Sequence, residues 1–328
     1  MKAMRCHEFG PPETLQLDEV KPLINPPKGS VVVSVEAAGV NFPDTLIVQG
    51  KYQFQPDMPF SPGGEVSGVI KEVGEGVQGL KVGDRVLAGT GWGGFAEEVI
   101  APASNTFKIP DAITYEQAAV VAEAYGTSYH ALVDRAQIQS GETLMVLGGA
   151  GGVGIAAVQI GKALEAKVIA VASSNEKLDF CREHGADLAI NYSEENLKER
   201  AKELTGGKGV DVIYDPVGAP FTESALRAIA WKGRHLIVGF AAGEIPKIPM
   251  NLPLLKGCSI VGVFWGGFFR QEPSANRENF MKILSLIESG KIDPPIQEVY
   301  ALKDASRALR HIMDRKVLGK VVLKIHNA

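Results

Sequence analysis

The fold of this chain is decided by one stretch, residues 143–154, which runs Thr143-Leu144-Met145-Val146-Leu147 and then Gly148-Gly149-Ala150-Gly151-Gly152-Val153-Gly154. The first five residues are typical of a buried strand, and apolar residues at helical spacing follow the glycines. The glycines match the pattern G-x-G-x-x-G. Between a strand and a helix they permit a tight turn and close approach of the backbone to a pyrophosphate. The stretch therefore predicts a dinucleotide site made by Gly149, Ala150, Gly151, Gly152, Val153 and Gly154, and a merely structural turn is the alternative.

Short apolar strands alternate with helical segments from this stretch onward. The expected strands are residues 143–147, 167–172, 187–191, 210–215, 235–238 and 259–264, and the first helices between them are 152–164, 175–184, 194–204 and 221–229. Six such strands predict a doubly wound parallel sheet with right-handed crossovers, the Rossmann arrangement. The longest apolar run, 258–269, falls short of the roughly 20 residues that span a bilayer, and we expect a buried strand there.

The N-terminal part of the chain has a different pattern. Between residues 31 and 110, short β-branched runs are punctuated by glycines, which is typical of an all-β, barrel-like region. Thr114 and Gln117 then have the spacing of a capping box at the start of a helical stretch. A last strand, 320–325, lies beyond the set of six, so we expect it to return to the N-terminal β region. The predicted domains are residues 1–124 and 265–328 around an inserted nucleotide-binding domain, 125–264.

Charge and cysteine content limit the partners and the compartment. The formal net charge of -4 argues against a broad basic surface for nucleic acid or anionic membrane, so any phosphate site must be local. Cys6, Cys181 and Cys258 are far apart and odd in number, as expected for free thiols in a reducing compartment. Residues 1–12 contain no apolar signal core. These features predict a cytoplasmic protein without nucleic-acid or membrane partners.

The end of the second expected strand indicates which dinucleotide binds. An NAD site places an Asp or Glu there, about 20 residues after the glycines, to accept a hydrogen bond from the ribose 2′-hydroxyl. Here the strand ends in Ser173 and Ser174, and Lys177 follows one turn into the next helix. Hydroxyl groups and an ammonium suit a 2′-phosphate, so NADPH is the predicted cofactor. The alternative is that Lys177 is a solvated surface residue, and the neighbouring Glu176 is expected to turn away.

Several further segments resemble, in the same order, the signature of medium-chain dehydrogenases/reductases. They are Gly39-Val40-Asn41-Phe42-Pro43-Asp44, Pro62-Gly63-Gly64-Glu65-Val66-Ser67-Gly68, Val82-Gly83-Asp84-Arg85-Val86, Gly126-Thr127-Ser128-Tyr129 and Gly319-Lys320-Val321-Val322-Leu323. The resemblance covers nearly the whole chain and points to the branch of quinone oxidoreductases and enoyl-thioester reductases. It implies an α/β fold in which the six-stranded Rossmann domain is inserted into a GroES-like β-barrel catalytic domain made of both chain ends.

The sequence departs from the alcohol-dehydrogenase branch of this superfamily at the zinc ligands. In that branch a Cys after the first Gly and a His in a Gly-His-Glu segment bind catalytic zinc, whereas this chain has Val40-Asn41 and Gly64-Glu65. Residues 90–98 contain no cysteine for a structural zinc, and the histidines are scattered without an i,i+4 pair. We therefore predict no metal site.

The resemblance implies two catalytic residues, Tyr52 and Asn41. In enoyl-thioester reductases of the family, a tyrosine after a stretch similar to Gln49-Gly50-Lys51 is the proposed proton donor, because a phenol can protonate or hydrogen-bond an enolate. A pocket-wall aromatic is the alternative for Tyr52. Asn41 is expected to contact the nicotinamide ribose or the substrate, with a structural turn as the alternative. Asp44 is expected to cap the next helix, and Glu65 to be a structural carboxylate.

Further cofactor contacts follow from family positions. Thr127 belongs to the signature, Tyr192 resembles the aromatic that covers the adenosine 2′-phosphate, and Lys320, like Arg270, is expected either to reach a cofactor phosphate or to be a surface charge. The fifth strand is expected to end over the nicotinamide and the sixth to end beside it, at Val238, Gly239 and Phe240 and at Phe264, Trp265 and Gly266, respectively. Trp92, Phe95 and Phe268 are candidates for an apolar substrate wall, although aromatic residues more often fill cores.

These features together predict a zinc-independent, NADPH-dependent oxidoreductase. Its substrate would be a small apolar electrophile, either a quinone or an activated C=C bond in an enone or an enoyl or acryloyl thioester. The alternative is a non-catalytic NADPH-binding protein of the crystallin or RNA-binding type, against which the negative net charge and the intact pocket signatures argue. We expect a homodimer, because strand 259–264 would lie at the edge of the Rossmann sheet, where unpaired backbone groups invite a second subunit.

Overall fold

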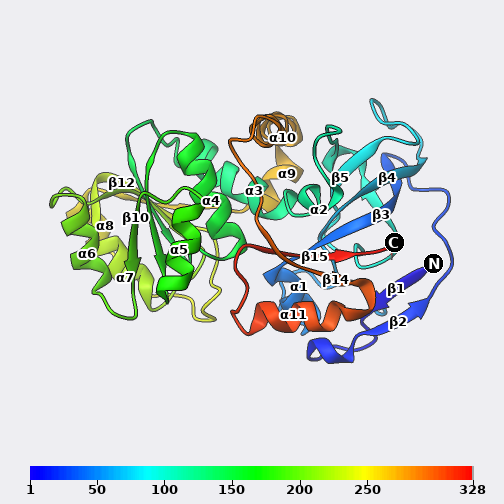
Figure 1. The fold of residues 1–328 in the computed structure, drawn as a ribbon, viewed down its shortest axis with the longest axis horizontal. Coiled ribbons are helices and arrows are strands. Elements are labelled where there is room, and N and C mark those ends of the chain that lie inside the picture. The colour runs from blue at the N-terminus through cyan, green and yellow to red at the C-terminus, as the bar shows by residue number, and fades with distance from the viewer. Residues whose placement is uncertain (327–328) are drawn as a thin grey trace. The chain divides into compact units, whose positions relative to one another are not determined.

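The computed structural model describes residues 1–326, which form two compact units (Figure 1). The terminal unit consists of Met1–Glu123 and the segment from Phe269 onward, and the central unit is Ala124–Phe268. We propose that these units are the two domains, with boundaries after Glu123 and Phe268 in place of the expected 124/125 and 264/265. The last two residues of the expected segment 265–328 lie outside the described residues.

The central unit contains a six-stranded parallel sheet. Its strands lie in the order β10 (Leu188–Asn191), β9 (Lys167–Ala172), β8 (Thr143–Leu147), β11 (Val210–Asp215), β12 (Ile229–Ile237) and β13 (Ser259–Gly262). This order changes direction at β8, which carries the glycine-rich turn at its end, as in doubly wound nucleotide-binding folds. The expected six-stranded Rossmann sheet is confirmed.

Helices cover both faces of this sheet because its inner strands are apolar on both sides. Met145 and Leu147 share a core with α6, α7 and α8, whereas Leu144 lies against α4 on the other face. The helices are α3 (Ala122–Tyr129), which starts in the terminal unit and continues as a π-helical turn (η3, His130–Arg135), α4 (Gly152–Ala163), α5 (Asn175–Glu183), α6 (Leu197–Leu204), α7 (Phe221–Arg227) and α8 (Asn251–Lys256).

The last two strands of the sheet differ from the expected bounds. Strand β12 begins six residues before the expected 235–238, because it bulges between Ile229 and Arg234, where Lys232 has a φ of +61°. The expectation of a buried strand over the apolar run 258–269 is wrong. Strand β13 ends at Gly262 and is mostly exposed, since it has a neighbour on one side only, and helix α9 (Trp265–Gln271) follows. The apolar run combines a short edge strand with the start of a helix.

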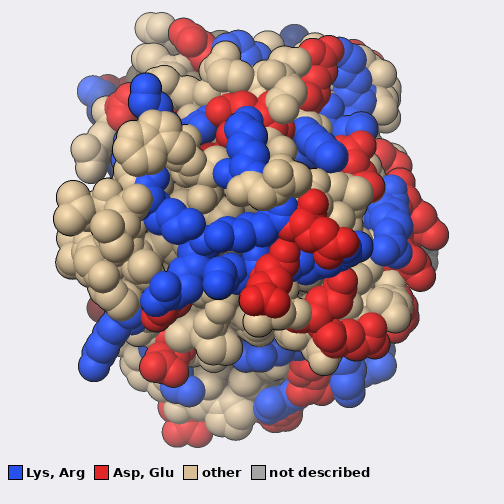
Figure 2. Space-filling view, turned by 90° about the vertical axis from the view of Figure 1, so that its left-hand side faces the viewer, with Lys and Arg blue, Asp and Glu red and all other residues tan. Residues whose placement is uncertain are grey.

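Basic side chains gather on one face of the central unit. Figure 2 shows a band of Lys and Arg across this face with Asp and Glu beside it. In the same unit, the charges of Lys198 and Lys202 on α6 and of Arg227 on α7 act on Lys256 of α8, and the pKa of Lys256 is lowered by partial burial and by these charges. Although the net charge of the chain is negative, this face is locally basic.

The terminal unit is built on one long strand, β3 (Ser30–Val40). Residues 30–34 of β3 pair with β6, and residues 37–40 pair with β15, so the expected return of the last strand to the N-terminal β region is confirmed. The seven-stranded sheet contains β14 (Ile296–Ala301), β15 (Lys320–Lys324), β3, β4 (Glu65–Val73), β5 (Arg85–Gly89), β7 (Thr106–Lys108) and β6 (Glu98–Pro102), and a separate pair is β1 (Lys2–Arg5) with β2 (Gln16–Glu19).

Seven helices and helical turns complete the terminal unit in the described residues. They are η1 (Pro12–Thr14), α1 (Phe42–Ile47), η2 (Ala103–Asn105), α2 (Tyr115–Ala118), α10 (Pro273–Glu288), η4 (Leu302–Asp304) and α11 (Ala305–Met313). The expected capping box at the start of α2 is confirmed, because the Gln117 amide N–H donates to the Thr114 hydroxyl at 3.1 Å and the Thr114 N–H donates to the Gln117 side chain at 3.1 Å.

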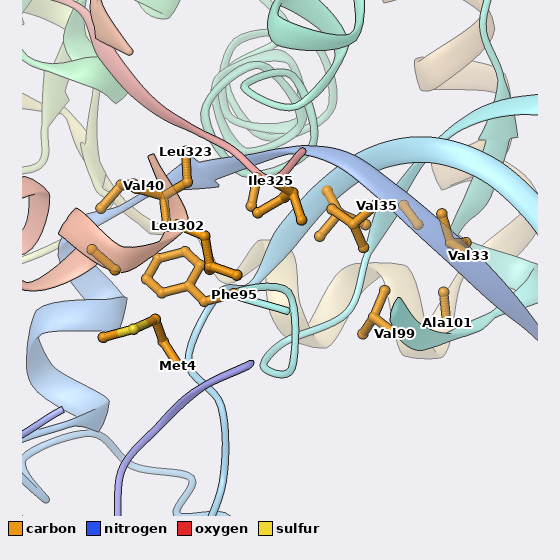
Figure 3. Close-up of a cluster of buried hydrophobic side chains, with 14 of the residues drawn as sticks. Met4, Val33, Val35, Val40, Phe95, Val99, Ala101, Leu302, Leu323 and Ile325 are labelled. Atoms are coloured by element: carbon orange, nitrogen blue, oxygen red, sulfur yellow. The ribbon is translucent and has the colours of Figure 1, made fainter. Parts of the chain in front are cut away.

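The core of the terminal unit lies on the inner face of the sheet (Figure 3). Alternate residues of β3 point into it, and Leu302 and Leu323 contribute from the C-terminal segment. Phe95 is fully buried in this core, so the expectation that it lines a substrate wall is wrong. A side chain without exposed surface stabilises the unit by burial and presents nothing to a ligand.

The structure bears on the expected free thiols and on membrane spans. Cys6, Cys181 and Cys258 are free thiols. Within residues 1–326, no helix is both long and apolar enough to cross a membrane. The cytoplasmic location stays a prediction.

Candidate active site

A buried polar cluster lies where β3 ends and α1 begins in the terminal unit. Asn41 precedes α1, and its backbone N–H donates to the Asp44 carboxylate at 2.8 Å. This reciprocal bond satisfies a donor at the helix start, where the chain turns out of the strand. Asp44 also accepts the Gly63 N–H at 3.1 Å. The expected capping role of Asp44 is confirmed, although it acts from the third helical position.

Glu65 and Lys320 hold the Asn41 side chain from β4 and β15, the two strands that flank the end of β3. The Asn41 Nδ2 donates to Glu65 Oε1 at 2.7 Å, and the Lys320 ammonium donates to Asn41 Oδ1 and, at 3.0 Å, to Glu65 Oε1. All three residues are at most 8% exposed. A buried lysine and glutamate that are paired and hydrogen-bonded in this way are costly to separate. The expectation that Glu65 is a structural carboxylate agrees with these contacts.

Two further carboxyl groups border this cluster, and the pKa values of both are raised well above their usual range. Burial, followed by the repulsion of Glu65, raises the pKa of Asp44 to about 7 against two backbone hydrogen bonds that lower it. Burial, followed by the charges of Asp44 and Glu65, raises the pKa of Glu123 to about 8. The Lys320 charge opposes both shifts but does not cancel them. Clustered carboxyl groups with raised pKa values are typical of sites that handle protons.

Tyr52 lies near these carboxyl groups and is half-buried. Its ring packs against the core of the terminal unit and meets Phe54 edge-on at 6.3 Å. Burial, followed by the charges of Glu123 and Asp44, raises the pKa of its phenol. The hydroxyl makes no hydrogen bond to any of residues 1–326, so it is available to a substrate or to solvent. A phenol that holds its proton firmly can donate a hydrogen bond.

The glycine-rich turn of the central unit needs glycine at its two ends, Gly148 and Gly154. Gly148 has a φ of +62°, and a Cβ on Gly154 would lie 2.1 Å from the Gly148 carbonyl oxygen. Gly151 caps helix α4 without a side-chain bond. The first turn of α4 therefore presents its backbone N–H groups, which together with the helix dipole favour an anion.

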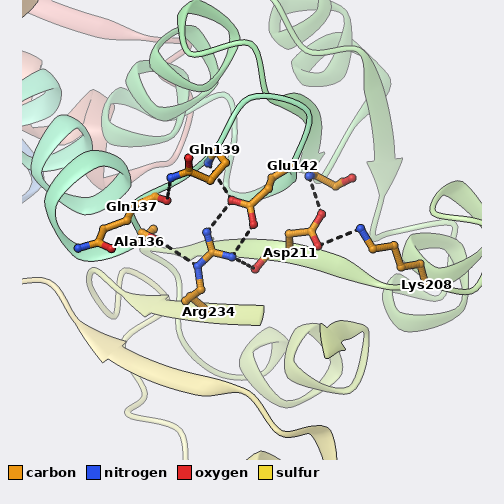
Figure 4. A network of polar contacts seen from close by, with 8 residues as sticks. Ala136, Gln137, Gln139, Glu142, Lys208, Asp211 and Arg234 are labelled. Atoms are coloured by element: carbon orange, nitrogen blue, oxygen red, sulfur yellow. Dashed lines mark hydrogen bonds and ion pairs between the residues drawn. The ribbon is translucent and has the colours of Figure 1, made fainter. Parts of the chain in front are cut away.

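The opposite ends of these strands are held by a separate network (Figure 4). Arg234 donates to both carboxylate oxygens of Glu142, at 2.8 and 2.6 Å, and Asp211 accepts the Thr143 N–H at 2.9 Å. Bidentate pairs of this kind fix geometry strongly. The network anchors the amino ends of β8, β11 and β12, so their carboxyl ends, where the glycine turn lies, are held in register.

The residues expected to bind a 2′-phosphate are brought together after β9. The Lys177 ammonium donates to Ser173 Oγ at 3.3 Å, and Ser174 Oγ caps helix α5 by accepting the Lys177 N–H at 3.4 Å. Tyr192 follows β10 and packs its ring against Phe221 at 4.4 Å. The sheet order places β9 and β10 side by side, which explains why residues far apart in sequence lie at one edge.

Other expected contacts lie where β11 and β12 end. The Val238 N–H donates to the Asp215 carbonyl at 2.9 Å, and Phe240 lies over Gly218, with 37% of its surface exposed. The Asp215 carboxylate binds the N–H groups of Val217 and Gly218. This arrangement fixes the loop after β12, which contains Val238, Gly239 and Phe240. Phe264 is half-exposed, but Trp265 and Gly266 belong to α9 and do not end a strand.

Comparison with known proteins places this chain in a family. The model of the alcohol dehydrogenase GroES-like domain matches residues 27–111, and the model of the zinc-binding dehydrogenase family matches residues 152–288. A quinone oxidoreductase-like protein 2 homolog of Nematostella vectensis is 42% identical over 325 residues, which cover 98% of this chain and 88% of that protein. The chain belongs to the quinone oxidoreductase branch of the medium-chain dehydrogenase/reductase superfamily.

Other members of the quinone oxidoreductase branch are similar over their whole length. Human quinone oxidoreductase is 32% identical, and the match covers 98% of this chain and 97% of that protein. The crystal structure of Escherichia coli quinone oxidoreductase complexed with NADPH is 33% identical and superimposes with a TM-score of 0.91 over 99% of this chain and all of that one. The expected fold class, a Rossmann domain inserted into a GroES-like domain, is confirmed.

The structure decides between the alternatives for some of the expected site residues, and the ligand roles of the others are untested. Lys320 is no surface charge, because it is 2% exposed and paired with Glu65. Phe268 is buried and stacks on His130 at 3.9 Å, so the core alternative holds for it. Trp92 is 45% exposed. The ligand roles of Asn41, Tyr52, Thr127 and the other expected site residues stay predictions.

Glu123 lies at the candidate site, although the sequence did not point to it. The residue lies in a helical stretch without a motif, and no spacing connects it with Glu65, whose carboxylate accepts the Glu123 N–H at 2.8 Å. The one available signal was Gly64, since a glycine in place of the family's zinc-binding histidine leaves room for another side chain.

Proposed function

We propose that this chain is a zinc-independent oxidoreductase that uses NADPH to reduce a quinone or an activated C=C bond. The observation that carries the proposal is the cluster around Tyr52, where a half-buried phenol with an available hydroxyl lies near carboxyl groups of raised pKa. The family and the NADPH complex of the Escherichia coli relative support the choice of reaction class.

The residues of the central unit fit NADPH. The glycine turn would receive the pyrophosphate, because its backbone is open at Gly151 and closed to side chains at Gly154. Ser173, Ser174 and Lys177 would hold the 2′-phosphate, since their hydroxyl and ammonium groups already lie within one turn. When bound, the cofactor supplies the hydride.

The terminal unit would supply the proton. Tyr52 donates its hydroxyl proton, or a hydrogen bond, to the oxygen or carbon that becomes negative when the acceptor is reduced. Asn41, Glu65 and Lys320 hold α1 and β15 against β4 and so fix the cluster that borders Tyr52. We assign Lys320 to this scaffold and not to a cofactor phosphate, because its ammonium is already paired.

A conjugated acceptor suits this set of groups better than a simple carbonyl. Isolated carbonyl reduction needs strong polarisation of the oxygen, which zinc provides in the alcohol-dehydrogenase branch. A conjugated acceptor spreads the arriving charge over an enolate or a quinol oxygen, which one hydrogen bond can stabilise. Quinones, enones and enoyl thioesters are therefore the proposed substrate classes, and simple alcohols are expected to be poor substrates.

The experiment that tests this function is a screen of acceptors. Oxidation of NADPH is followed at fixed enzyme concentration with quinones, enones, nitroalkenes and short enoyl thioesters, and simple alcohols with NADP+ serve as the contrasting class. With NADPH deuterated at the transferred position, an enone product should carry label at the β-carbon and take its α-proton from solvent. Turnover of quinones alone, without labelled product, narrows the function to quinone reduction, and turnover of no acceptor refutes the proposal.

We also propose a homodimer through the edge of the Rossmann sheet. Strand β13 pairs on one side only, and four large apolar side chains of β12, α8 and β13 are exposed. These are Trp231, Leu254, Leu255 and Ile260, which are 72%, 79%, 71% and 38% exposed. An apolar area next to an unpaired strand edge favours association with a second copy.

A further inference from the structure

The backbone of Glu123 holds this residue next to the buried polar cluster of Asn41, Asp44, Glu65 and Lys320. Its N–H donates to Glu65 Oε2 at 2.8 Å, so the first turn of α3 is tied to the carboxylate that also binds Asn41 and Lys320. This bond fixes the point from which the Glu123 side chain starts.

The Glu123 carboxyl group occupies space that Gly64 leaves open. A Cβ on Gly64 would lie 2.3 Å from Glu123 Oε1 and 3.3 Å from its Cδ. The side chain therefore folds back over the segment Gly63-Gly64-Glu65, toward the carboxyl groups of Asp44 and Glu65. In the alcohol-dehydrogenase branch a zinc-binding histidine stands at the position of Gly64. In this chain the Glu123 carboxyl group occupies the space that the side chain of that histidine would take.

Glu123 differs from the other carboxyl groups of the cluster in its hydrogen bonds and its exposure to solvent. Asp44 accepts two backbone N–H groups and is 3% exposed, and Glu65 is fully buried between Asn41 and Lys320. The carboxyl oxygens of Glu123 make no hydrogen bond to any of residues 1–326, and the side chain is partly exposed. A carboxyl group that is partly exposed and not fixed by hydrogen bonds can exchange its proton with solvent.

We propose that Glu123 is the group that returns a proton to Tyr52 after each reduction. The inference rests on the proposed function. In each turnover the acceptor gains a hydride and then the proton of the Tyr52 hydroxyl, which leaves a phenolate. Because no direct hydrogen bond joins the two groups, the proton passes through a water between them: the O–H bond of the Glu123 carboxyl breaks, the water takes that proton and gives one to the phenolate, and the Glu123 carboxylate regains a proton from solvent. The balance is one hydride and one proton for each acceptor reduced.

The electrostatics of the cluster agree with this order of transfer. The pKa of Glu123 is raised to about 8 by burial and by Asp44 and Glu65, so the carboxyl is protonated at neutral pH. The groups that face it are Asp44, Glu65, Lys320 and Tyr52. A general acid works best when its pKa lies near the working pH, and Glu123 meets this condition. Glu123 acts through Tyr52 and is a positioning residue in this scheme.

Two variants of the full-length chain test the inference. Glu123→Gln keeps the shape of the side chain but cannot donate a proton as an acid. Gly64→Ala keeps Glu123 but forces its carboxyl away, since the added Cβ would meet Oε1 and the backbone at Gly64 has no positive φ. The matched control is Glu278→Gln, at an exposed position of α10.

The measurement is kcat against pH, with the best acceptor of the screen and saturating NADPH. Wild type should lose activity as pH rises through about 8, because Glu123 loses its proton. Glu123→Gln should lower kcat at neutral pH by about 10², lose this descending limb and regain activity with added imidazolium as an external proton donor. Gly64→Ala should show the same changes in part, and both variants should bind NADPH as wild type does.

Other results overturn the inference. If Glu123→Gln has the kcat of wild type and loses activity with rising pH as wild type does, the phenol regains its proton from another group. If Glu123→Gln has a lower kcat that imidazolium does not restore, and its activity still falls above pH 8, Glu123 has a structural role. If Glu123→Gln fails to bind NADPH, Gly64→Ala decides. If wild type reduces no acceptor, the proposed function fails, and infrared titration still tests Glu123: absence of a carboxyl that titrates near pH 8 and disappears in Glu123→Gln overturns the assignment.

Discussion

Tyr52 is the residue on which the proposed chemistry depends most directly. Its phenol has an available hydroxyl, and its pKa is raised by burial and by Glu123 and Asp44. Tyr52→Phe removes the proton but keeps the ring against Phe54, so we expect kcat to fall by about 10²-fold or more while NADPH affinity stays unchanged. Steady-state kinetics and a fluorescence titration with NADPH measure the two effects. Full activity with every acceptor would identify Tyr52 as a pocket-wall aromatic.

Asp44 should make the stability of the protein depend on pH in an unusual direction. Its pKa is raised from the usual 3.8 to about 7 in the folded state, mainly by burial, so the folded chain holds a proton that the unfolded chain releases. The contribution is fully present below pH 3.8 and is lost as pH rises through about 7. One proton corresponds to about 1.4 kcal/mol per pH unit inside this window.

We therefore expect Asp44→Asn to flatten this dependence. Denaturant unfolding between pH 5 and pH 8 should show a smaller decrease of the unfolding free energy with pH in the variant, even though loss of the bonds to Asn41 and Gly63 lowers its overall stability. Asp57→Asn, at an exposed position, serves as the control. Equal slopes for Asp44→Asn and wild type would show that Asp44 is ionised in the folded chain.

Lys177 should determine the choice between NADPH and NADH. Its ammonium lies 3.3 Å from Ser173 Oγ, where a 2′-phosphate would accept from both. A charge-assisted hydrogen bond contributes about 1.5–3 kcal/mol, so Lys177→Ala should weaken NADPH binding by roughly 10- to 150-fold and leave NADH binding nearly unchanged. Dissociation constants for both nucleotides decide this. Lys167→Ala, at the other end of β9, is the control, and tighter binding of NADH by wild type would refute the prediction.

At the scale of elements, strand β13 connects the fold with the proposed dimer. Its residues pair with β12 and leave the other side open, and Ile260 lies on it with 38% of its surface exposed. A carboxylate at this position would lose its water on dimer formation, which costs free energy, whereas it would stay hydrated in a monomer. We expect wild type to have twice the mass of one chain by light scattering and Ile260→Asp to be monomeric. Met281→Asp, at an exposed position of α10, should stay dimeric, and a monomeric wild type would exclude the dimer.

At the scale of the whole molecule, the donor atoms do not favour zinc. Among residues 1–326, no group of three or more His, Cys, Asp or Glu side chains is arranged to hold a metal ion, and Glu65 is already paired with Lys320. Zinc prefers three or four soft or imidazole ligands. Elemental analysis should therefore find no stoichiometric metal, and a chelator should leave turnover unchanged. One tightly held zinc per chain would show that the cluster had been misassigned.

The charge distribution is another property of the whole molecule. The net charge of -4 predicted no broad basic surface, yet Lys and Arg side chains form a band on one face of the central unit (Figure 2). A sum of charges contains no information about their positions, because residues from α6, α7 and α8 meet only after folding. The absence of a nucleic-acid partner stays a prediction.

The sequence by itself determined the local features of this protein. The glycine turn, the capping box at Thr114 and the short apolar runs of the first four strands depend on neighbours within a few residues, so their backbone preferences could be inferred without tertiary contacts. The place of Ser173, Ser174 and Lys177 could be inferred for the same reason, since all three lie within one turn of the end of β9.

Only the tertiary structure decided which of the long-range partners meet. Lys320 and Asn41 are 279 residues apart, and their contact requires β15 to pair with β3. Glu123 reaches the space beside Gly64 because its backbone binds Glu65, which no spacing in the sequence indicates. Burial in this cluster then sets the protonation of Asp44 and Glu123, because the free energy of a charge depends on the solvent and charges around it and not on the residue type alone.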